Sequence, residues 1–166
     1  MKGIEIQPER EIQIDLNVTS YIPDEYISDS NQKIEIYQNI ALCRNEENIQ
    51  NVIDEIIDRF GNMPEELENL IEIARIKYMA KQLQIEKIAS KKTAVVFIFQ
   101  RTSETKMLPN KPGTDGIDIS KLIEKYGNNI KFSAGIKPTI TLEIGSNNER
   151  KILNDVTNFC KDLISL

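Results

Sequence analysis

The segment NEENIQNVIDEIIDRFG, residues 45–61, has the most regular apolar pattern in the chain. Its apolar residues recur every three or four positions, which places them on one side of an α-helix. They are Ile49, Val52, Ile53, Ile56, Ile57 and Phe60. The helix is expected to begin near Asn45, and Gly61 is the residue type that most often ends a helix in a left-handed conformation. Its apolar side must be covered by neighbouring elements.

Two further helices are predicted next to this one. The first begins after Ser28-Asp29-Ser30, any of which can cap it, and its expected apolar side holds Ile34, Tyr37, Ile40 and Ala41. The third is opened by Pro64 and extends to about Leu83. Because this third helix is apolar on more than one side, we expect it to be the central and most buried helix.

The N-terminal residues predict a strand and an arm. Residues 1–10 have the composition of a polar linker. Residues 11–19 alternate between apolar and polar side chains, which is typical of a half-buried strand. Pro23 holds Ile22 extended, so residues 21–27, YIPDEYI, are expected to be a connecting arm.

The latter part of the chain has a different pattern. Thr93–Phe99 is predicted to be a buried strand, and Ile130–Ala134 with Thr139–Ile144 an antiparallel pair. Residues 110–116, NKPGTDG, indicate a turn-rich loop. A short helix capped by Asp118 and a last helix opened by a capping box of Ser146 and Glu149 complete the set. Their expected apolar positions are Ile119, Leu122, Ile123 and Tyr126, and then Ile152, Leu153, Val156, Phe159, Cys160, Leu163 and Ile164.

The predicted fold class is therefore α+β. A helical N-terminal part, reaching to about residue 90, packs with a small, mainly antiparallel sheet and flanking helices in residues 91–166. A length of 166 residues fits one such domain.

Composition argues against several kinds of chemistry. The chain has no histidine and no CxxC spacing, and it lacks phosphate-binding and hydrolase motifs. We therefore expect no catalytic residues, no metal and no cofactor. Cys43 and Cys160 are expected to be buried or half-buried free thiols rather than a metal site or a disulfide. No apolar run is long enough to span a membrane, and the expected location is the cytoplasm.

The net charge of −5 is unevenly distributed. Residues 1–60 hold 13 acidic and 5 basic residues, whereas residues 61–166 hold 13 and 16. An acidic first part favours a basic protein surface as partner. The alternative is a nucleic-acid-binding module that uses the basic latter part. The lysines and aromatics that could serve it are also explained by a strand core with a charged edge; they are Lys91, Lys92, Phe97, Phe99 and Arg101.

Residues 12–88 resemble a known family. The arm IPDEYISD (22–29), the helix around 37–41, IDRFG with Pro64, and LIEIARIK (70–77) are similar to the C-terminal domain of the bacterial transcription-repair coupling factor, Mfd. The order of the elements after residue 90 is also similar, whereas the stretch 101–116 has no counterpart that can be assigned.

This resemblance implies a regulatory role. Members of the family are ATP-driven DNA translocases that displace stalled RNA polymerase from double-stranded DNA and recruit UvrA through a UvrB-like module. Their C-terminal domain packs on that module and masks the UvrA-binding surface. Residues 1–10 would then be the linker from the upstream translocase modules, and residues 11–166 a regulatory domain that does not hydrolyse ATP.

The resemblance also implies where the contact lies. In the family, acids on the helix that leads into the RFG segment meet arginines of the UvrB-like module, and Glu55 and Asp58 occupy those positions. Asp54 shares the polar side of the helix. Acids in the last turns of a helix oppose its dipole, which favours a role beyond solubility; the alternative is a solvated face. Arg59 either braces the loop at Gly61 or faces the partner.

Overall fold

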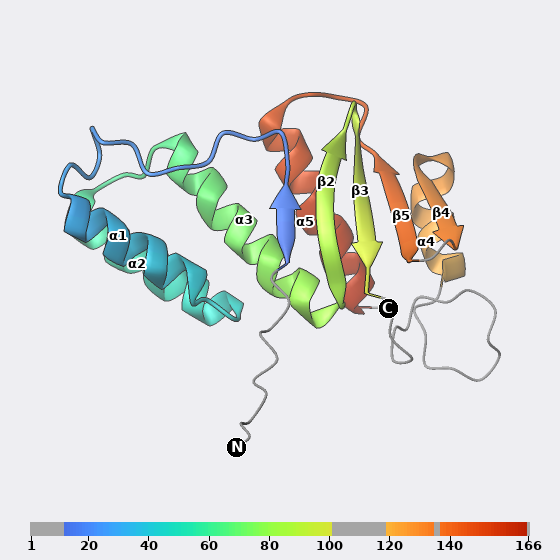
Figure 1. The fold of residues 1–166 in the computed structure, drawn as a ribbon, viewed down its shortest axis with the longest axis horizontal. Helices are drawn as coiled ribbons and strands as arrows, with labels where there is room; N and C mark the ends of the chain where they lie inside the picture. The colour runs from blue at the N-terminus through green and yellow to red at the C-terminus, as the bar shows by residue number, and fades with distance from the viewer. Residues whose placement is uncertain (1–11, 101–118, 135–136, 166) are drawn as a thin grey trace, which may run out of the picture.

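The computed structural model describes residues 12–100, 119–134 and 137–165. A helical hairpin lies at one end of the molecule, a long helix runs through the middle, and a five-stranded sheet backed by helices forms the other end (Figure 1). The elements are β1 (Gln13–Asp15), α1 (Ser30–Ala41), α2 (Glu46–Phe60), α3 (Glu65–Gln82), β2 (Ile85–Lys91), β3 (Ala94–Phe99), α4 (Ile119–Tyr126), the 3-10 turn η1 (Gly127–Asn129), β4 (Ile130–Ala134), β5 (Pro138–Glu143) and α5 (Glu149–Ser165). The α+β class is confirmed.

The three N-terminal helices form the first hydrophobic core. Asp29 caps α1 by accepting hydrogen bonds from the amides of residues 31 and 32. The predicted apolar side of α1 is wrong in part, because Ile36 is fully buried whereas Ile34 is 54% exposed and Tyr37 36%. Ile36 and Ile40 of the helix, with Cys43 just beyond its end, pack into the core instead.

The sheet has the order β1-β2-β3-β5-β4. β1 pairs with β2 in parallel, and the other pairs are antiparallel. Strand β2 was not predicted, so the expected boundary of the helical part at about residue 90 is wrong: the sheet begins again at Ile85. A register shift between Ile85 and Lys87 breaks the alternation that would identify a strand.

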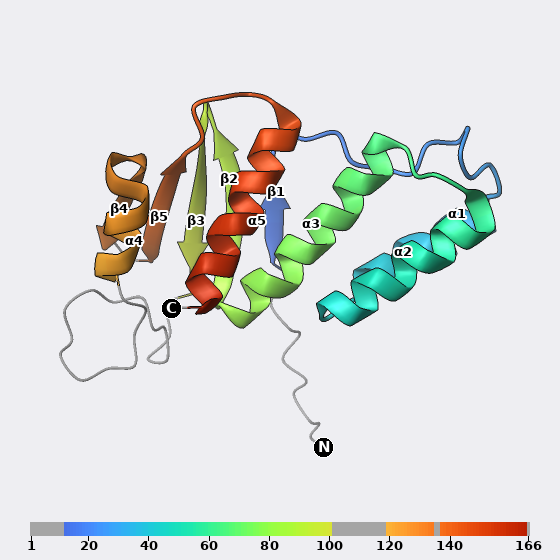
Figure 2. The same cartoon turned by 180° about the vertical axis from the view of Figure 1, so that it is seen from behind.

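In the described ranges, helices cover one side of the sheet (Figures 1 and 2). α5 and α3 pack there against each other, and the second core surrounds Phe97, Phe99 and Phe159. Burial of Leu122 and of most predicted α5 positions is confirmed, but Ile123 is 51% exposed and Ile164 43%. The expected burial of these two residues is therefore wrong.

The predicted capping box of α5 is wrong. The side chain of Asn148 accepts from the amide of Lys151, and its carbonyl accepts from Ile152. Ser146 instead accepts from the amide of Asn148. Glu149 accepts a hydrogen bond from the amide of Thr19, so its carboxylate ties the arm to α5.

Cys43 and Cys160 are free and buried, as predicted. No helix within the described residues is long and apolar enough to cross a membrane. The linker 1–10 and the loop 110–116, together with Arg101, Asp118 and the bend at 135–136, lie outside the described residues.

Candidate protein-interaction surface on α2

Helix α2 is defined by local signals at both ends. Asn45 caps it, with its side chain accepting from the amide of Asn48 at 2.8 Å. Gly61 ends it with φ +89°, a conformation that glycine adopts without strain. Tyr26 of the arm donates to the carbonyl of Gly61 at 2.5 Å and packs against Phe60, with ring centroids 5.9 Å apart. The arm thereby holds the C-terminal end of α2, from which the candidate residues project.

The predicted acids lie together on the exposed side of α2. Asp54 and Asp58 are one helical turn apart, and Glu55 lies beside them toward α1. All three are exposed. We call Asp54, Glu55 and Asp58 the acidic face of α2. In Figure 2, α2 lies in front of α1, so this view shows the side of the molecule on which α2 is the outer helix.

The neighbours of these acids differ. Gln50 donates to Asp54 at 2.9 Å. Glu55 lies 3.5 Å from the guanidinium of Arg59. Among the described residues, Asp58 has no ion-pair partner. Asp58 is therefore the acid most available to an external cation.

Arg59 is engaged within the molecule. Its guanidinium lies 3.5 Å from both Glu35 of α1 and Glu55, and 5.0 Å from the centre of the Phe60 ring. The ion pairs of Arg59 among the described residues are with Glu35 and Glu55, and not with the neighbouring Asp58. Arg59 instead joins the outer surfaces of α1 and α2, beside the loop at Gly61.

The sequence did not identify one member of this surface. Ile57 was expected to be buried but is 44% exposed, next to Asp58 and three residues from Asp54. Ile49 and Ile56 fill the core contact, so Ile57 falls outside it. An exposed apolar residue among acids gives the surface an apolar contact as well as charge, which protein interfaces combine.

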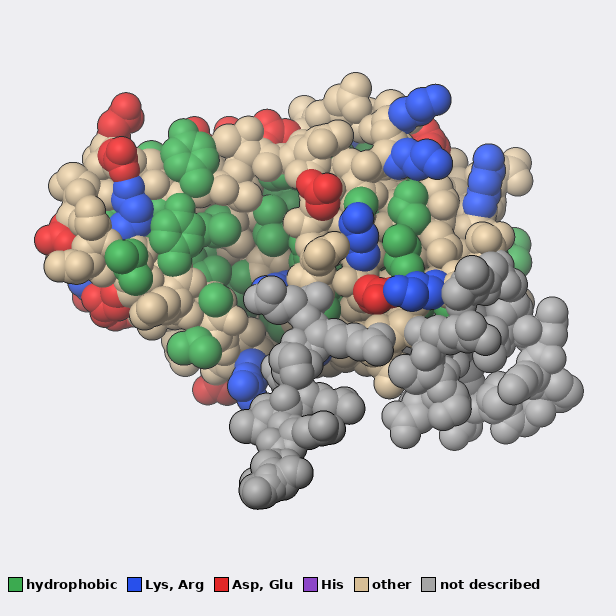
Figure 3. Space-filling model, in the orientation of Figure 1, with side chains coloured by type: hydrophobic (Ala, Val, Ile, Leu, Met, Phe, Trp, Pro, Cys, Tyr) green, Lys and Arg blue, Asp and Glu red, His purple; other side chains and the backbone are tan. Residues whose placement is uncertain are grey.

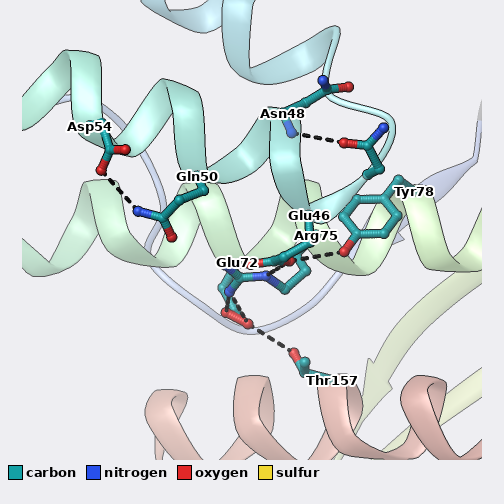
Figure 4. A network of polar contacts seen from close by, with 9 residues as sticks. Glu46, Asn48, Gln50, Asp54, Glu72, Arg75, Tyr78 and Thr157 are labelled. Carbon is teal, nitrogen blue, oxygen red and sulfur yellow. Dashed lines mark hydrogen bonds and ion pairs between the residues drawn. The ribbon is translucent and has the colours of Figure 1, made fainter.

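A second polar cluster fixes α2 on the rest of the domain (Figure 4). Arg75 of α3 forms a bidentate ion pair with Glu46 at the start of α2, and both nitrogen–oxygen distances are 2.7 Å. Its third nitrogen contacts both carboxylate oxygens of Glu72 at 2.9 and 2.5 Å. Glu72 also accepts from Thr157 of α5 at 3.3 Å. Three helices are thus joined through one arginine.

This cluster shifts the pKa values of two of its members, Glu46 and Tyr78. The hydrogen bonds from Arg75 hold the pKa of Glu46 below its usual range, although partial burial opposes this. Burial, with the hydrogen bond donated to Glu46, raises the pKa of Tyr78 to about 12. Glu46 is therefore ionised and Tyr78 protonated at neutral pH, so the cluster is fully formed there.

The sequence could not identify this cluster, because Glu46 and Arg75 are separated by 29 positions. Within the cluster, only Glu72 and Arg75 are three positions apart on one helix, a spacing at which a contact can be expected from the sequence.

The cysteine thiol at position 160 and the buried phenylalanines are unsuited to nucleophilic chemistry and to nucleic-acid binding, respectively. Burial raises the pKa of the Cys160 thiol to about 12, which keeps it unreactive at neutral pH. Phe97 and Phe99 are fully buried, so they cannot stack on nucleic-acid bases. Lys91 and Lys92 are exposed. No group of three or more potential metal-ligating side chains occurs in the described ranges.

Comparison with known proteins decides the family. The sequence model of the TRCF domain matches residues 16–109, more than half of the chain.

The chain belongs to the TRCF domain family.

The TRCF domain match extends through α2 and the Glu46–Arg75 cluster and confirms the resemblance noted above. Two similar proteins are transcription-repair-coupling factors. That of Bacillus subtilis (strain 168) is 31% identical over 92% of this chain and 12% of its own length. That of Rickettsia prowazekii (strain Madrid E) is 35% identical over 75% of this chain and 10% of its own length. The TRCF chain described here thus spans about a tenth of these relatives.

A solved structure has the same fold. The crystal structure of the C-terminal domain of a transcription-repair coupling factor superposes with a TM-score of 0.74 over 95% of both chains, at 23% sequence identity. The mixed sheet and its helices are therefore those of a TRCF domain.

Proposed function

We propose that this TRCF domain is a non-catalytic, autoinhibitory part of a transcription-repair coupling factor, and that its acidic face docks on the UvrB-like module of the same protein. Docking there would mask the surface that binds UvrA. The observation that carries the proposal is the exposed acidic face of α2, with Asp58 free of any ion pair among the described residues and Ile57 exposed beside it.

The contact has a physical basis in the charges at the end of α2. Asp58 lies in the last turn, where the helix dipole disfavours a negative charge by roughly 0.3–1 kcal/mol. An arginine from the partner would relieve this and bind the carboxylate through two parallel hydrogen bonds.

Glu55 can join the same contact at little cost. Its pair with Arg59 is exposed, with side-chain accessibilities of 43% and 31%. Exposed ion pairs contribute roughly 0–1 kcal/mol, so Glu55 loses little stabilisation when it exchanges Arg59 for a cation of the partner. A contact of this kind is specific but releasable, as a regulatory contact must be.

The names of the relatives support a proposal for the wider role. Proteins named transcription-repair-coupling factors are roughly seven to eight times as long as this chain. We propose that the parent is a cytoplasmic, ATP-dependent translocase on double-stranded DNA that contacts RNA polymerase. In this proposal the TRCF domain itself contributes restraint rather than catalysis.

The test measures UvrA binding to the full-length parent with the double substitution Glu55→Ala, Asp58→Ala. The matched control is Glu124→Ala, Asp155→Ala, which removes two acids at other helices. We expect UvrA binding to increase at least tenfold in the first variant and to stay unchanged in the control. Equal binding in both variants, with both folded, would refute docking through the acidic face.

A further inference from the structure

A groove lies on a different side of the molecule from the acidic face. Its wall and floor come from the C-terminal end of α1, from α3 and from Ile12 just before β1. Its volume of about 560 Å³ is in the range of ligand-binding pockets. The apolar floor includes Ile40, Leu42, Ala74 and Tyr78.

The charged side chains that line this groove, within the part of the chain that the structure describes, are positive. Among the described residues, Arg44, Lys77 and Lys81 line it and no carboxylate does, while Glu46 accepts a hydrogen bond from the lining residue Tyr78. Lys77 and Lys81 are one turn apart on α3, on the same side as Ala74. Within the described residues, the side chains of Arg44 and Lys77 form no ion pair. A positive groove in a chain of net charge −5 calls for an anionic ligand.

Apolar surface continues from the groove along α1. Leu42 is 68% exposed, and Tyr37 and Ile34 are exposed on the outer side of the helix. From Ile34 to Leu42 the helix rises about 12 Å, which is about two turns. Figure 3 shows hydrophobic side chains gathered over α1 and in the hollow beside it.

We infer that this groove and the adjoining surface of α1 bind an acidic amphipathic helix of a partner protein. Apolar side chains from one face of that helix would enter the floor, as in other complexes in which a helix lies in a groove. Its carboxylates would meet Arg44 and Lys77 at the rim. The two-turn length of the apolar strip matches a helix rather than a single small molecule.

A nucleic acid fits this surface less well. Its affinity comes mainly from many phosphate contacts, and here three cations surround an apolar floor. The one aromatic residue of the lining, Tyr78, donates its hydroxyl to Glu46 at 3.0 Å. The hydroxyl of Tyr78 is therefore already engaged within the domain.

The groove is independent of the acidic face. α1 lies in front of α2 in Figure 1 and behind it in Figure 2, so the outer sides of the two helices point in opposite directions. Both surfaces can therefore be occupied at the same time, and failure of one proposal leaves the other standing.

The experiment uses the 166-residue chain and a fluorescein-labelled peptide of about 15 residues, long enough to form a helix, with leucines along one face and glutamates elsewhere. Binding is measured by fluorescence anisotropy. We expect the double reversal Arg44→Glu, Lys77→Glu to weaken it at least tenfold, and Leu42→Asp to weaken it as well. The matched control is Lys121→Glu, Lys131→Glu, which changes the net charge equally at exposed sites elsewhere.

Two comparisons decide the outcome. A peptide of the same composition, with its leucines spread around the helix, should bind at least tenfold more weakly. If the acidic peptide does not bind, or binds the control and reversed variants equally, the inference is wrong. Preferential binding of a single-stranded DNA oligonucleotide or of oleate at the same residues would also overturn it. Circular dichroism checks that each variant is folded.

Discussion

Replacement of Arg75 by methionine tests whether the polar cluster holds the α1–α2 hairpin on the domain. Arg75 and Glu72 are only 18% and 20% exposed, whereas Glu46 is 56% exposed. Without Arg75, Glu72 would keep a single hydrogen bond, from Thr157 at 3.3 Å. Leaving such a carboxylate largely unpaired costs roughly 1–3 kcal/mol, and loss of the exposed contact to Glu46 adds less than about 1 kcal/mol.

From the middle of these two ranges, the expected loss in free energy of unfolding is about 2–3 kcal/mol. This is below the roughly 3–5 kcal/mol for breaking a fully buried ion pair, because water still reaches the cluster. Urea unfolding at pH 7, followed by far-ultraviolet circular dichroism, measures it. The matched control is Arg150→Met, which removes an exposed pair with Glu68 at 3.4 Å. That variant should lose less than about 1 kcal/mol.

The same substitution should change the pH dependence of stability. The pKa of Glu46 is lowered in the folded state, so the unfolded chain binds the proton more readily. The stabilisation is then present above the unfolded pKa of about 4.3 and is lost as the pH falls below it. In Arg75→Met this acid-side loss should be smaller. A variant within about 0.5 kcal/mol of the original chain, with unchanged acid sensitivity, would refute the reasoning.

Three further predictions concern the core and the last helix. Phe97→Ala should cost roughly 3–5 kcal/mol in urea unfolding, because the ring is fully buried and its centroid lies 4.9 Å from that of Phe159; a loss below 1 kcal/mol would contradict the described packing. Cys160, with its pKa raised to about 12, should react with a thiol reagent at pH 7.5 only as fast as the chain unfolds, and rapid labelling without urea would contradict its burial. Asn148→Ala should destabilise the domain by about 1 kcal/mol because a helix cap is lost, and Ser146→Ala should destabilise it clearly less, as measured by thermal unfolding. A larger loss for Ser146→Ala than for Asn148→Ala would instead support Ser146 as the cap of α5.

The sequence alone determined the local features of the fold. Helix ends follow from residues whose effect is confined to one turn: Asp29 and Asn45 as caps, and Gly61 in its left-handed conformation. The regular pattern of α2 and the motifs around it were also enough to indicate the family, which the match over residues 16–109 confirms. Exposure of the acidic face follows from the same helical periodicity, because Asp54, Glu55 and Asp58 lie away from the apolar stripe.

The tertiary structure decided everything that depends on distant partners. Which side of α1 is buried depends on where α2 and α3 lie, and this left Ile34 exposed and Ile36 enclosed. Strand β2 exists because β1 and β3 satisfy its backbone, despite an irregular apolar pattern. Arg75 meets Glu46 only after the hairpin folds onto α3. The physical reason is that burial and ion pairing depend on all residues that lie close in space. The apolar and charge pattern of the sequence shows only which residues are close along the chain.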